Sequence, residues 1–303
     1  MTTIGFMRGL KPVLPLLKML DNVSSARTWR NASRSGVDPL QTMDSLIAAA
    51  EAAADVAGAV IRPHFRAGVA ADLKSDQSPV TIADRTAEQA MRAVLSERFP
   101  EHGIIGEEFP ARNPDARFRW VLDPIDGTRA FITGRPVFGT LVALLDGDTP
   151  ILGLIDQPVL GERWIGAAGR PTTFRGPFKG VAGCRSCAAL DAAELSCTTP
   201  EMFSTEDQAG FARLTAAARR VSYGGDCYAF GLLALGQIDV IAEADLKIWD
   251  WAALLPVVEG AGGRMTDWQG HALRPGCDGR VLAVGDPALL APALRLLGTC
   301  GSV

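Results

Sequence analysis

Acidic side chains follow two short apolar segments of this 303-residue chain. Asp123 and Asp126, three residues apart in the segment DPIDGT, come directly after the apolar run Trp120–Leu122. Glu107 and Glu108 follow a second apolar run, GIIG. Carboxylates only a few ångström apart cannot all stay ionised without a cation. If the two expected strands end on a shared face, these four acids predict a metal site.

Magnesium is the cation that this donor set favours. Mg²⁺ takes hard oxygen ligands in octahedral geometry and commonly bridges carboxylates to phosphate oxygens. The acids lack the spacing of an EF-hand loop, and the three histidines lie far apart in the sequence, which disfavours calcium and zinc. Pro124 fixes one backbone dihedral between the two aspartates, so both can point the same way with the carbonyl group of Ile125 between them.

The residues that follow the second aspartate favour a phosphate group as ligand. Gly127 allows an anion to approach the backbone closely, and a helix that begins at Thr128 would offer it unpaired N–H groups. Asp, Pro and Gly are also common turn formers, so DPIDGT taken alone fits a simple turn. The acids of GEE, and the pair WD at 249–250 that opens an expected helix, favour the site instead. Phosphatases with an aspartyl nucleophile place two aspartates two residues apart, so this spacing argues against them.

The periodicity of apolar residues predicts two layered lobes. Apolar residues recur every three to four positions in the expected helices, which are 43–63, 82–98, 205–219, 226–235, 249–263 and a last helix from Pro287. Short apolar runs predict strands at 103–108, 120–123, 138–158 (two strands), 163–174 (a hairpin), 239–244, 263–268 and 280–285, with one more leading into SYGGD. We therefore expect an antiparallel α+β lobe over 39–184 and an α/β lobe over 185–303, with the boundary in 176–195.

Composition limits the classes of function. A formal net charge of -4 argues against a nucleic-acid binder, and no apolar run reaches the roughly 20 residues of a membrane span. Six cysteines are too few for a disulfide framework in a chain of this length, so a reducing compartment, the cytoplasm, is expected. Residues 1–38 are rich in arginine and hydroxyl side chains and read as a leader or disordered extension; an organellar presequence is the alternative.

Three segments of the chain carry a resemblance to a known family. GEE (106–108), DPIDGT (123–128) and IWDWAALLPVVEGAGG (248–263) resemble the metal motifs of the inositol monophosphatase superfamily, which are lithium-sensitive magnesium phosphatases. The resemblance covers about residues 42–298 and implies a layered αβαβα sandwich. It also implies two or three Mg²⁺ ions and direct hydrolysis, in which a metal-activated water attacks phosphorus in line.

The resemblance assigns roles residue by residue. The implied metal ligands are Glu107, Asp123, the carbonyl oxygen of Ile125, Asp126 and Asp250. Asp84 and Thr128 would orient the attacking water, with Glu107 as the third catalytic residue. Lys74 matches a lysine near the same loop.

The middle of the chain narrows the resemblance to one branch. FITGRPVFGTLVALL, GLIDQPVLGERWIG and YGGDCYAFGLLALGQIDVIAEADLK resemble histidinol-phosphate phosphatases more than inositol or 3′-phosphonucleotide phosphatases. The implied substrate-binding residues are Gly127, Thr128, Gly224, Gly225, Asp226 and Glu243. Carboxylates suit the amine and imidazole of histidinol phosphate, although they suit sugar hydroxyls too. The alternatives are a helix N-cap for Asp226 and a solvated acid at a strand end for Glu243.

The expected function is therefore a magnesium-dependent phosphomonoester hydrolase. Its expected substrate is L-histidinol phosphate, which places it in histidine biosynthesis. Inositol 1-phosphate or another small sugar or nucleotide phosphate is the alternative, and a non-catalytic metal-binding scaffold is an alternative from another class. The expected partner is a small-molecule phosphate ester, with no nucleic acid and no membrane, and the expected assembly is a homodimer.

Overall fold

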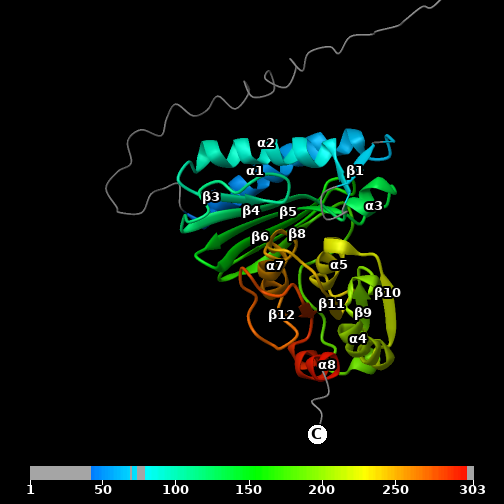
Figure 1. Ribbon diagram of the computed structural model, residues 1–303. Coiled ribbons are helices and arrows are strands. Elements are labelled where there is room, and N and C mark those ends of the chain that lie inside the picture. The colour runs from blue at the N-terminus through cyan, green and yellow to red at the C-terminus, as the bar shows by residue number, and fades with distance from the viewer. Residues whose placement is uncertain (1–41, 69, 74–78, 299–303) are drawn as a thin grey trace, which may run out of the picture. The chain divides into compact units, whose positions relative to one another are not determined.

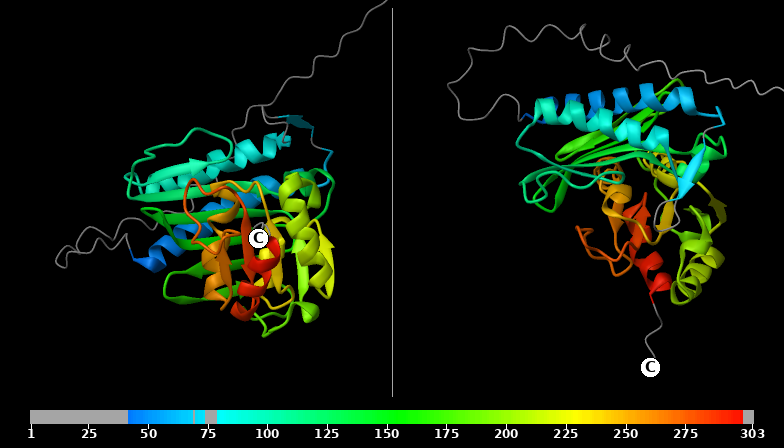
Figure 2. Two further views of the ribbon diagram at one scale, coloured as in Figure 1. Left: turned by 60° about the horizontal axis from the view of Figure 1, so that its bottom comes forward. Right: turned by 45° about the horizontal axis from the view of Figure 1, so that its top comes forward.

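The computed structural model describes residues 42–68, 70–73 and 79–298, and the part of the chain from Thr42 onward forms one compact unit. Its elements are stacked in five layers, helices alternating with sheets (Figure 1). Two helices cover one face of a six-stranded sheet, two lie between that sheet and a five-stranded one, and two cover the far face of the latter. Figure 2 shows the same layers from two other sides. The predicted layered αβαβα fold is confirmed.

The outer layer consists of α1 (Met43–Ile61) and α2 (Ile82–Arg98). Thr42 caps α1 by accepting a hydrogen bond from the N–H of Ser45 at 3.2 Å, and alanines dominate its buried face. Small side chains let the two helix backbones approach, which accounts for the close packing of α1 on α2. α2 matches its predicted range, and α1 ends two residues before its predicted end at residue 63.

The six-stranded sheet has the order β3-β4-β5-β6-β7-β8. The strands are β3 (Gly103–Gly106), β4 (Phe118–Asp126), β5 (Gly139–Asp146), β6 (Thr149–Gln157), β7 (Glu162–Ala167) and β8 (Arg170–Arg175). All neighbours are antiparallel except β3 and β4, which are parallel, so the sheet is mainly antiparallel, as predicted, with one parallel pair at its edge. The chain reverses direction twice between them. After β3 it turns back, so that Arg112 forms an isolated antiparallel bridge with Ile104, and it turns again before β4 begins.

The five-stranded sheet has the order β10-β9-β11-β13-β12, and its first three strands are parallel. The strands are β9 (Glu194–Cys197), β10 (Arg220–Tyr223), β11 (Val240–Glu243), β12 (Arg264–Thr266) and β13 (Val281–Val284), and a separate two-stranded sheet pairs β1 (Ala71–Leu73) with β2 (Pro79–Thr81). The helices are α3 (Thr128–Ile132), α4 (Thr205–Ala217), α5 (Asp226–Leu233), α6 (Ile248–Trp251), α7 (Leu254–Gly260) and α8 (Leu290–Leu297). α5 and α7 lie between the sheets, while α4 and α8 cover the outer face.

One predicted helix, 249–263, is two helices in the structure. A turn at residues 252–253 separates α6 from α7. Pro256, in the first turn of α7, has no N–H to bond the carbonyl group of Ala252, so a continuous helix would leave that carbonyl without its partner. Ala252 and Ala253 keep right-handed helical dihedrals, so the turn interrupts the hydrogen bonding while the backbone stays helical.

Candidate active site

The two aspartates of DPIDGT lie at an irregularity in β4. The register with β5 shifts between Asp123 and Asp126, because Pro124 has no N–H to donate to the ladder. The hydroxyl group of Thr140 on β5 instead donates to the carbonyl oxygen of Pro124 at 2.8 Å. The carboxylate of Asp123 accepts the N–H of Ile125 at 3.0 Å. The bend thus brings both carboxylates towards one cluster.

Asp123, Asp126 and Asp250 form this acidic cluster. Each offers one carboxylate oxygen, and these three oxygens all lie within 4.8 Å of one another. Asp250 sits in the first turn of α6, where its carboxylate accepts the N–H of Lys247 at 2.6 Å. The predicted convergence of DPIDGT and the WD segment is therefore present in the structure.

Burial raises the pKa of every member of the cluster. The pKa of Asp123 is well above its usual range. Burial is the largest cause, and the charges of Glu107, Asp126 and Asp250 raise the pKa further. The pKa of Asp126 is likewise well above its usual range, and that of Asp250 is raised to about 7. Three oxygen donors, one buried and two partly buried, that resist joint ionisation fit a hard divalent cation such as Mg²⁺.

Glu107 lies next to this cluster but outside its innermost trio of oxygens. Its charge is among the causes that raise the pKa of Asp123, Asp250 and Asp84, so it is close to all three. Its N–H donates to the carbonyl oxygen of Leu122 at 3.3 Å, which ties the end of β3 to β4. It also lines a wide cavity of about 460 Å³ in front of the cluster, together with Gly127, Thr128, Arg129 and Asp226.

Asp84 and Thr128 meet as predicted. The hydroxyl group of Thr128 lies 3.4 Å from a carboxylate oxygen of Asp84 and 3.1 Å from the carbonyl oxygen of Ile125. Asp84 is fully buried in the first turn of α2, where it accepts the N–H and hydroxyl of Thr81 in a capping box. Burial raises the pKa of Asp84 despite these hydrogen bonds.

Gly127 adopts a backbone conformation that precedes the start of α3. Its φ is 85°, in the left-handed region, and α3 begins at the next residue, Thr128, as predicted. A Cβ atom on Gly127 would lie 2.9 Å from the carboxyl carbon of Asp226. Residue 127 is therefore the point where the segment after β4 contacts the start of α5.

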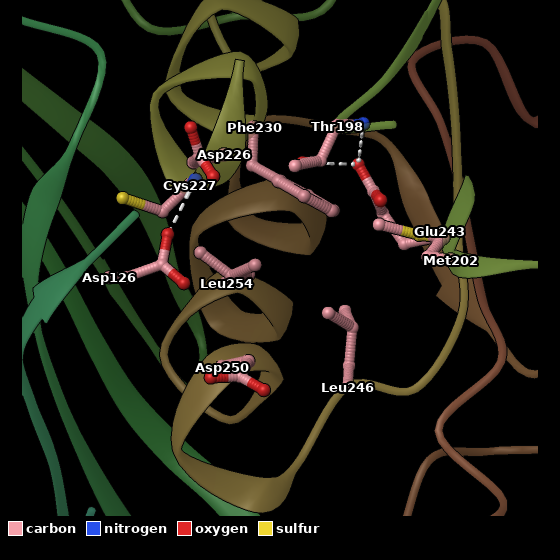
Figure 3. A pocket seen from close by; sticks show the side chains of 10 residues that line it. All are labelled: Asp126, Thr198, Met202, Asp226, Cys227, Phe230, Glu243, Leu246, Asp250 and Leu254. Atoms are coloured by element: carbon pink, nitrogen blue, oxygen red, sulfur yellow. Dashed lines mark hydrogen bonds between the residues drawn. The ribbon is translucent and has the colours of Figure 1, made fainter. Parts of the chain in front are cut away.

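A cavity of about 160 Å³ opens beside the acidic cluster (Figure 3). Figure 3 shows Asp126 and Asp226 on one wall and Glu243 and Thr198 on the opposite wall. The lining combines five polar or acidic residues and five residues with sulfur or apolar side chains: Asp126, Thr198, Asp226, Glu243, Asp250, Met202, Cys227, Phe230, Leu246 and Leu254.

Glu243 is buried at the end of β11, with 2% of its surface exposed, so the alternative of a solvated strand-end acid is wrong. One carboxylate oxygen accepts the N–H and the hydroxyl of Thr198 at 2.8 and 3.0 Å. The other, Oε2, is buried and has no hydrogen-bond partner among the described residues. Burial raises the pKa of Glu243 to about 8.

Asp226 is the first residue of α5, and Gly225 is its N-cap, so the alternative of an Asp226 N-cap is wrong. Gly224 has φ 81° and Asp226 has φ 43°, so this loop is sharply turned. Arg135 donates to the carbonyl oxygen of Gly224 at 2.9 Å. Burial raises the pKa of Asp226 to about 6, although the positive charges of Arg135 and Arg129 oppose the rise.

Sequence reasoning missed several residues around the cavity. Thr198 anchors Glu243, and the N–H of Cys227 donates to the carboxylate of Asp126 at 2.7 Å, which links α5 to the acidic cluster. Arg129 lines the wider cavity beside Asp226. No local pattern points to Thr198, whereas Arg129 directly follows DPIDGT and a basic residue there was a usable signal. The predicted Lys74 lies outside the described residues.

Comparisons with known proteins place this chain in a family. The model of the inositol monophosphatase family matches residues 42–298. The bifunctional phosphatase IMPL2, chloroplastic, of Arabidopsis thaliana is 49% identical over 230 residues, which are 75% of this chain and 66% of that protein. A histidinol-phosphatase of Mycobacterium tuberculosis is 38% identical over 230 residues, covering 73% of this chain and 86% of the relative.

A solved structure agrees with these matches. An inositol monophosphatase from Zymomonas mobilis has a TM-score of 0.77 and 50% sequence identity, over 86% of this chain and 99% of that one. The chain belongs to the inositol monophosphatase family, and the predicted resemblance is confirmed. It is a phosphatase of a metal-dependent family, and its acidic cluster supplies suitable metal donors. Within the described residues, no helix is both long and apolar enough to cross a bilayer.

Proposed function

We propose that this chain is a magnesium-dependent phosphomonoester hydrolase whose preferred substrate is L-histidinol phosphate, a role in histidine biosynthesis. The observation that carries the substrate is the unpartnered Oε2 of Glu243, buried in the cavity beside the metal cluster. A buried carboxylate oxygen without a donor costs free energy, and a cationic amine or imidazolium of the substrate would supply the donor. The similarity to a histidinol-phosphatase supports the same choice.

Asp226 on the opposite wall supports a substrate with two nitrogen-bearing groups. Between the two acids lie apolar side chains, among them Phe230 and Leu254, against which a flat ring can pack. An acidic pair with an apolar floor fits an imidazole that carries an amine. It fits a ring that bears hydroxyl groups on every carbon less well.

The metal ligands in this proposal are Glu107, Asp123, the Ile125 carbonyl oxygen, Asp126 and Asp250. When bound, two or three Mg²⁺ ions would supply positive charge that stabilises the phosphate oxygens and acidifies a water molecule.

The remaining roles belong to the chain's own residues. Gly127 and the N–H groups at the start of α3 would bind the phosphate group. Thr128, whose hydroxyl lies between two acceptors, would orient the attacking water; it would accept a proton from that water while its own hydroxyl proton moves to Asp84. Gly224 and Gly225 hold Asp226 at the organic part of the substrate. A homodimer and a cytoplasmic location stay predictions, and the expected leader, residues 1–38, lies outside the described residues.

The experiment is a comparison of kcat/KM for histidinol phosphate, inositol 1-phosphate and glycerol 2-phosphate in wild type and Glu243→Gln. We expect histidinol phosphate to be the best wild-type substrate. The variant should lose about 10- to 100-fold on histidinol phosphate, the worth of one hydrogen bond between charged groups, and much less on glycerol 2-phosphate. Glu194→Gln is the control, since Glu194 begins β9 and pairs with Arg220 away from the cavity.

Equal losses of Glu243→Gln on all three esters would show that Glu243 supports the fold rather than the amine. Inositol 1-phosphate is the second candidate substrate, because a structure 50% identical in sequence is of an inositol monophosphatase. A higher kcat/KM for inositol 1-phosphate would overturn the histidinol assignment and leave the phosphatase proposal intact.

A further inference from the structure

A buried ion pair on α2 lies directly behind the segment that carries Glu107. Glu88 is fully buried, one helical turn after Asp84, and it accepts a hydrogen bond from Nε of Arg92 at 2.7 Å. Its other carboxylate oxygen accepts the N–H of Glu108 at 2.7 Å. A fully buried carboxylate paired with a mostly buried guanidinium, this close to the proposed active site, calls for an explanation.

The same pair holds the segment at a second backbone group. Nη2 of Arg92 donates to the carbonyl oxygen of Phe109 at 2.9 Å. On the other side of Glu107, a Cβ atom at Gly106 would lie only 2.1 Å from Oε1 of Glu88, so this position leaves room for the carboxylate and nothing else. Gly106, before Glu107, is therefore in close contact with the ion pair, and Glu108 and Phe109, after it, are hydrogen-bonded to the pair.

Stability alone does not account for an ion pair in this place. Burial raises the pKa of Glu88, which shows that its charge is costly, and apolar side chains of similar volume often stabilise a fold as well as a buried pair does. An apolar pair, however, has neither an acceptor for the N–H of Glu108 nor a donor for the carbonyl group of Phe109. An acid and a guanidinium together can bond both the N–H of Glu108 and the carbonyl oxygen of Phe109, and so fix the backbone conformation of this segment.

The position of Glu88 on the helix adds to this argument. Asp84 and Glu88 are four residues apart, so they share the buried face of α2. Asp84 reaches the hydroxyl of Thr128, while Glu88 reaches the backbone after β3. α2 thereby fixes the position of Asp84 and Thr128 relative to the backbone that carries Glu107.

We propose that Glu88 and Arg92 are positioning residues that fix the carboxylate of Glu107 in the metal site. The inference rests on the proposed role of Glu107 as a metal ligand. Neither residue touches the metal or the substrate in this proposal. Their effect is transmitted through the backbone of residues 106–109.

The test is Mg²⁺ binding to Glu88→Gln, measured by calorimetric titration and by the rise in melting temperature that Mg²⁺ causes. Partners that orient metal ligands typically contribute 10- to 100-fold to metal affinity, so we expect a dissociation constant about tenfold higher. The Mg²⁺ concentration for half-maximal turnover should rise by the same factor, with kcat at saturating Mg²⁺ within about twofold of wild type.

Asp239→Asn is the matched control. Asp239 is also a fully buried carboxylate that accepts one backbone N–H, from Glu194 at 2.7 Å, and an arginine Nε, from Arg185 at 2.8 Å. It precedes β11, at the end of that strand opposite Glu243. We expect Asp239→Asn to lower the melting temperature of the metal-free protein as much as Glu88→Gln does and to leave Mg²⁺ affinity unchanged.

Unchanged Mg²⁺ affinity in Glu88→Gln, or an equal loss of affinity in Asp239→Asn, would overturn the proposal. If Glu88→Gln does not fold, Arg92→Lys removes the hydrogen bond to Phe109 and keeps the charge, and it must raise the dissociation constant for the proposal to stand. Glu107→Gln separates the two levels of inference. If that variant binds Mg²⁺ as wild type does, the ligand role of Glu107 fails, whereas an effect in Glu107→Gln alone refutes only the positioning role.

Discussion

Neutralising Asp250 should stabilise the metal-free protein while it removes metal binding. The pKa of Asp250 is raised from 3.8 to about 7, chiefly by burial and next by the charge of Glu107, against the N–H of Lys247. A raised pKa means that the fold disfavours the carboxylate form. The protonated side chain of Asp250 therefore contributes stability in full below about pH 4, and this contribution is lost as the pH rises from there towards 7.

The magnitude follows from that shift and from the distances in the cluster. At about 1.4 kcal/mol per unit of pKa, the full shift costs about 4 kcal/mol at pH 8. Two unit charges within 4.8 Å repel by at least about 3.5 kcal/mol at an effective dielectric constant of about 20. Because Asp250 keeps some contact with solvent, and asparagine retains only part of the bond to Lys247, we expect about half of the larger figure, about 2 kcal/mol.

The assay is urea unfolding of wild type and Asp250→Asn in EDTA at pH 8 and pH 5. The variant should be more stable at pH 8 by about 2 kcal/mol, and this gain should fall to less than half at pH 5. Added Mg²⁺ should raise the stability of wild type and leave the variant nearly unchanged. Asp286→Asn is a control of opposite sign, since backbone N–H groups lower the pKa of Asp286. A loss of stability in Asp250→Asn at pH 8 would refute the reasoning.

Two more predictions concern the same site. Gly127→Ala should lose about 1–3 kcal/mol of stability and at least tenfold in kcat/KM, because a Cβ there would meet Asp226; Gly161→Ala, at φ 71° in open space, is the control that measures backbone strain alone. Mg²⁺ binding should release protons below about pH 7, and affinity should fall as the pH is lowered from 8 to 6, since metal must displace protons from carboxyls such as Asp250. Calorimetry in two buffers of different ionisation enthalpy measures this release, and a heat independent of buffer would contradict it.

Local sequence signals predicted the parts of this site that depend on neighbouring residues. The helix 82–98 was predicted from its apolar period, and both of its ends were predicted correctly; the Thr81–Asp84 capping box is a finding of the structure. The spacing of DPIDGT predicted two carboxylates on one side and a helix from Thr128, because proline and glycine restrict or free the same dihedrals in any fold.

Features that depend on distant contacts were not predictable in this way. Glu243 receives its hydrogen bonds from Thr198, 45 residues away, and nothing in either segment encodes that pairing. The break between α6 and α7 was missed because the apolar period continues across it, although Pro256 was a visible signal. Glu88 left a clearer signal, an acid on the apolar face of a helix, which ordinarily indicates a buried partner.

The three clustered aspartates are oriented by the same kind of hydrogen bond, which explains how a cluster of mutually repelling carboxylates keeps its geometry. Each uses its carboxylate to accept one backbone N–H, with distances of 2.6 to 3.0 Å, and the donors are Ile125, Cys227 and Lys247. A backbone donor orients a carboxylate without neutralising it, whereas a lysine or arginine in the same place would compete with the cation. The donor to Asp126, Cys227, is the second residue of α5 and directly follows Asp226, so a displacement of the Asp126 carboxylate would also move the proposed substrate side of the cavity. The proposed metal site and the proposed substrate cavity are thus joined by a hydrogen bond between layers, and we expect a bound cation to regain the free energy that the uncompensated charges cost the metal-free fold.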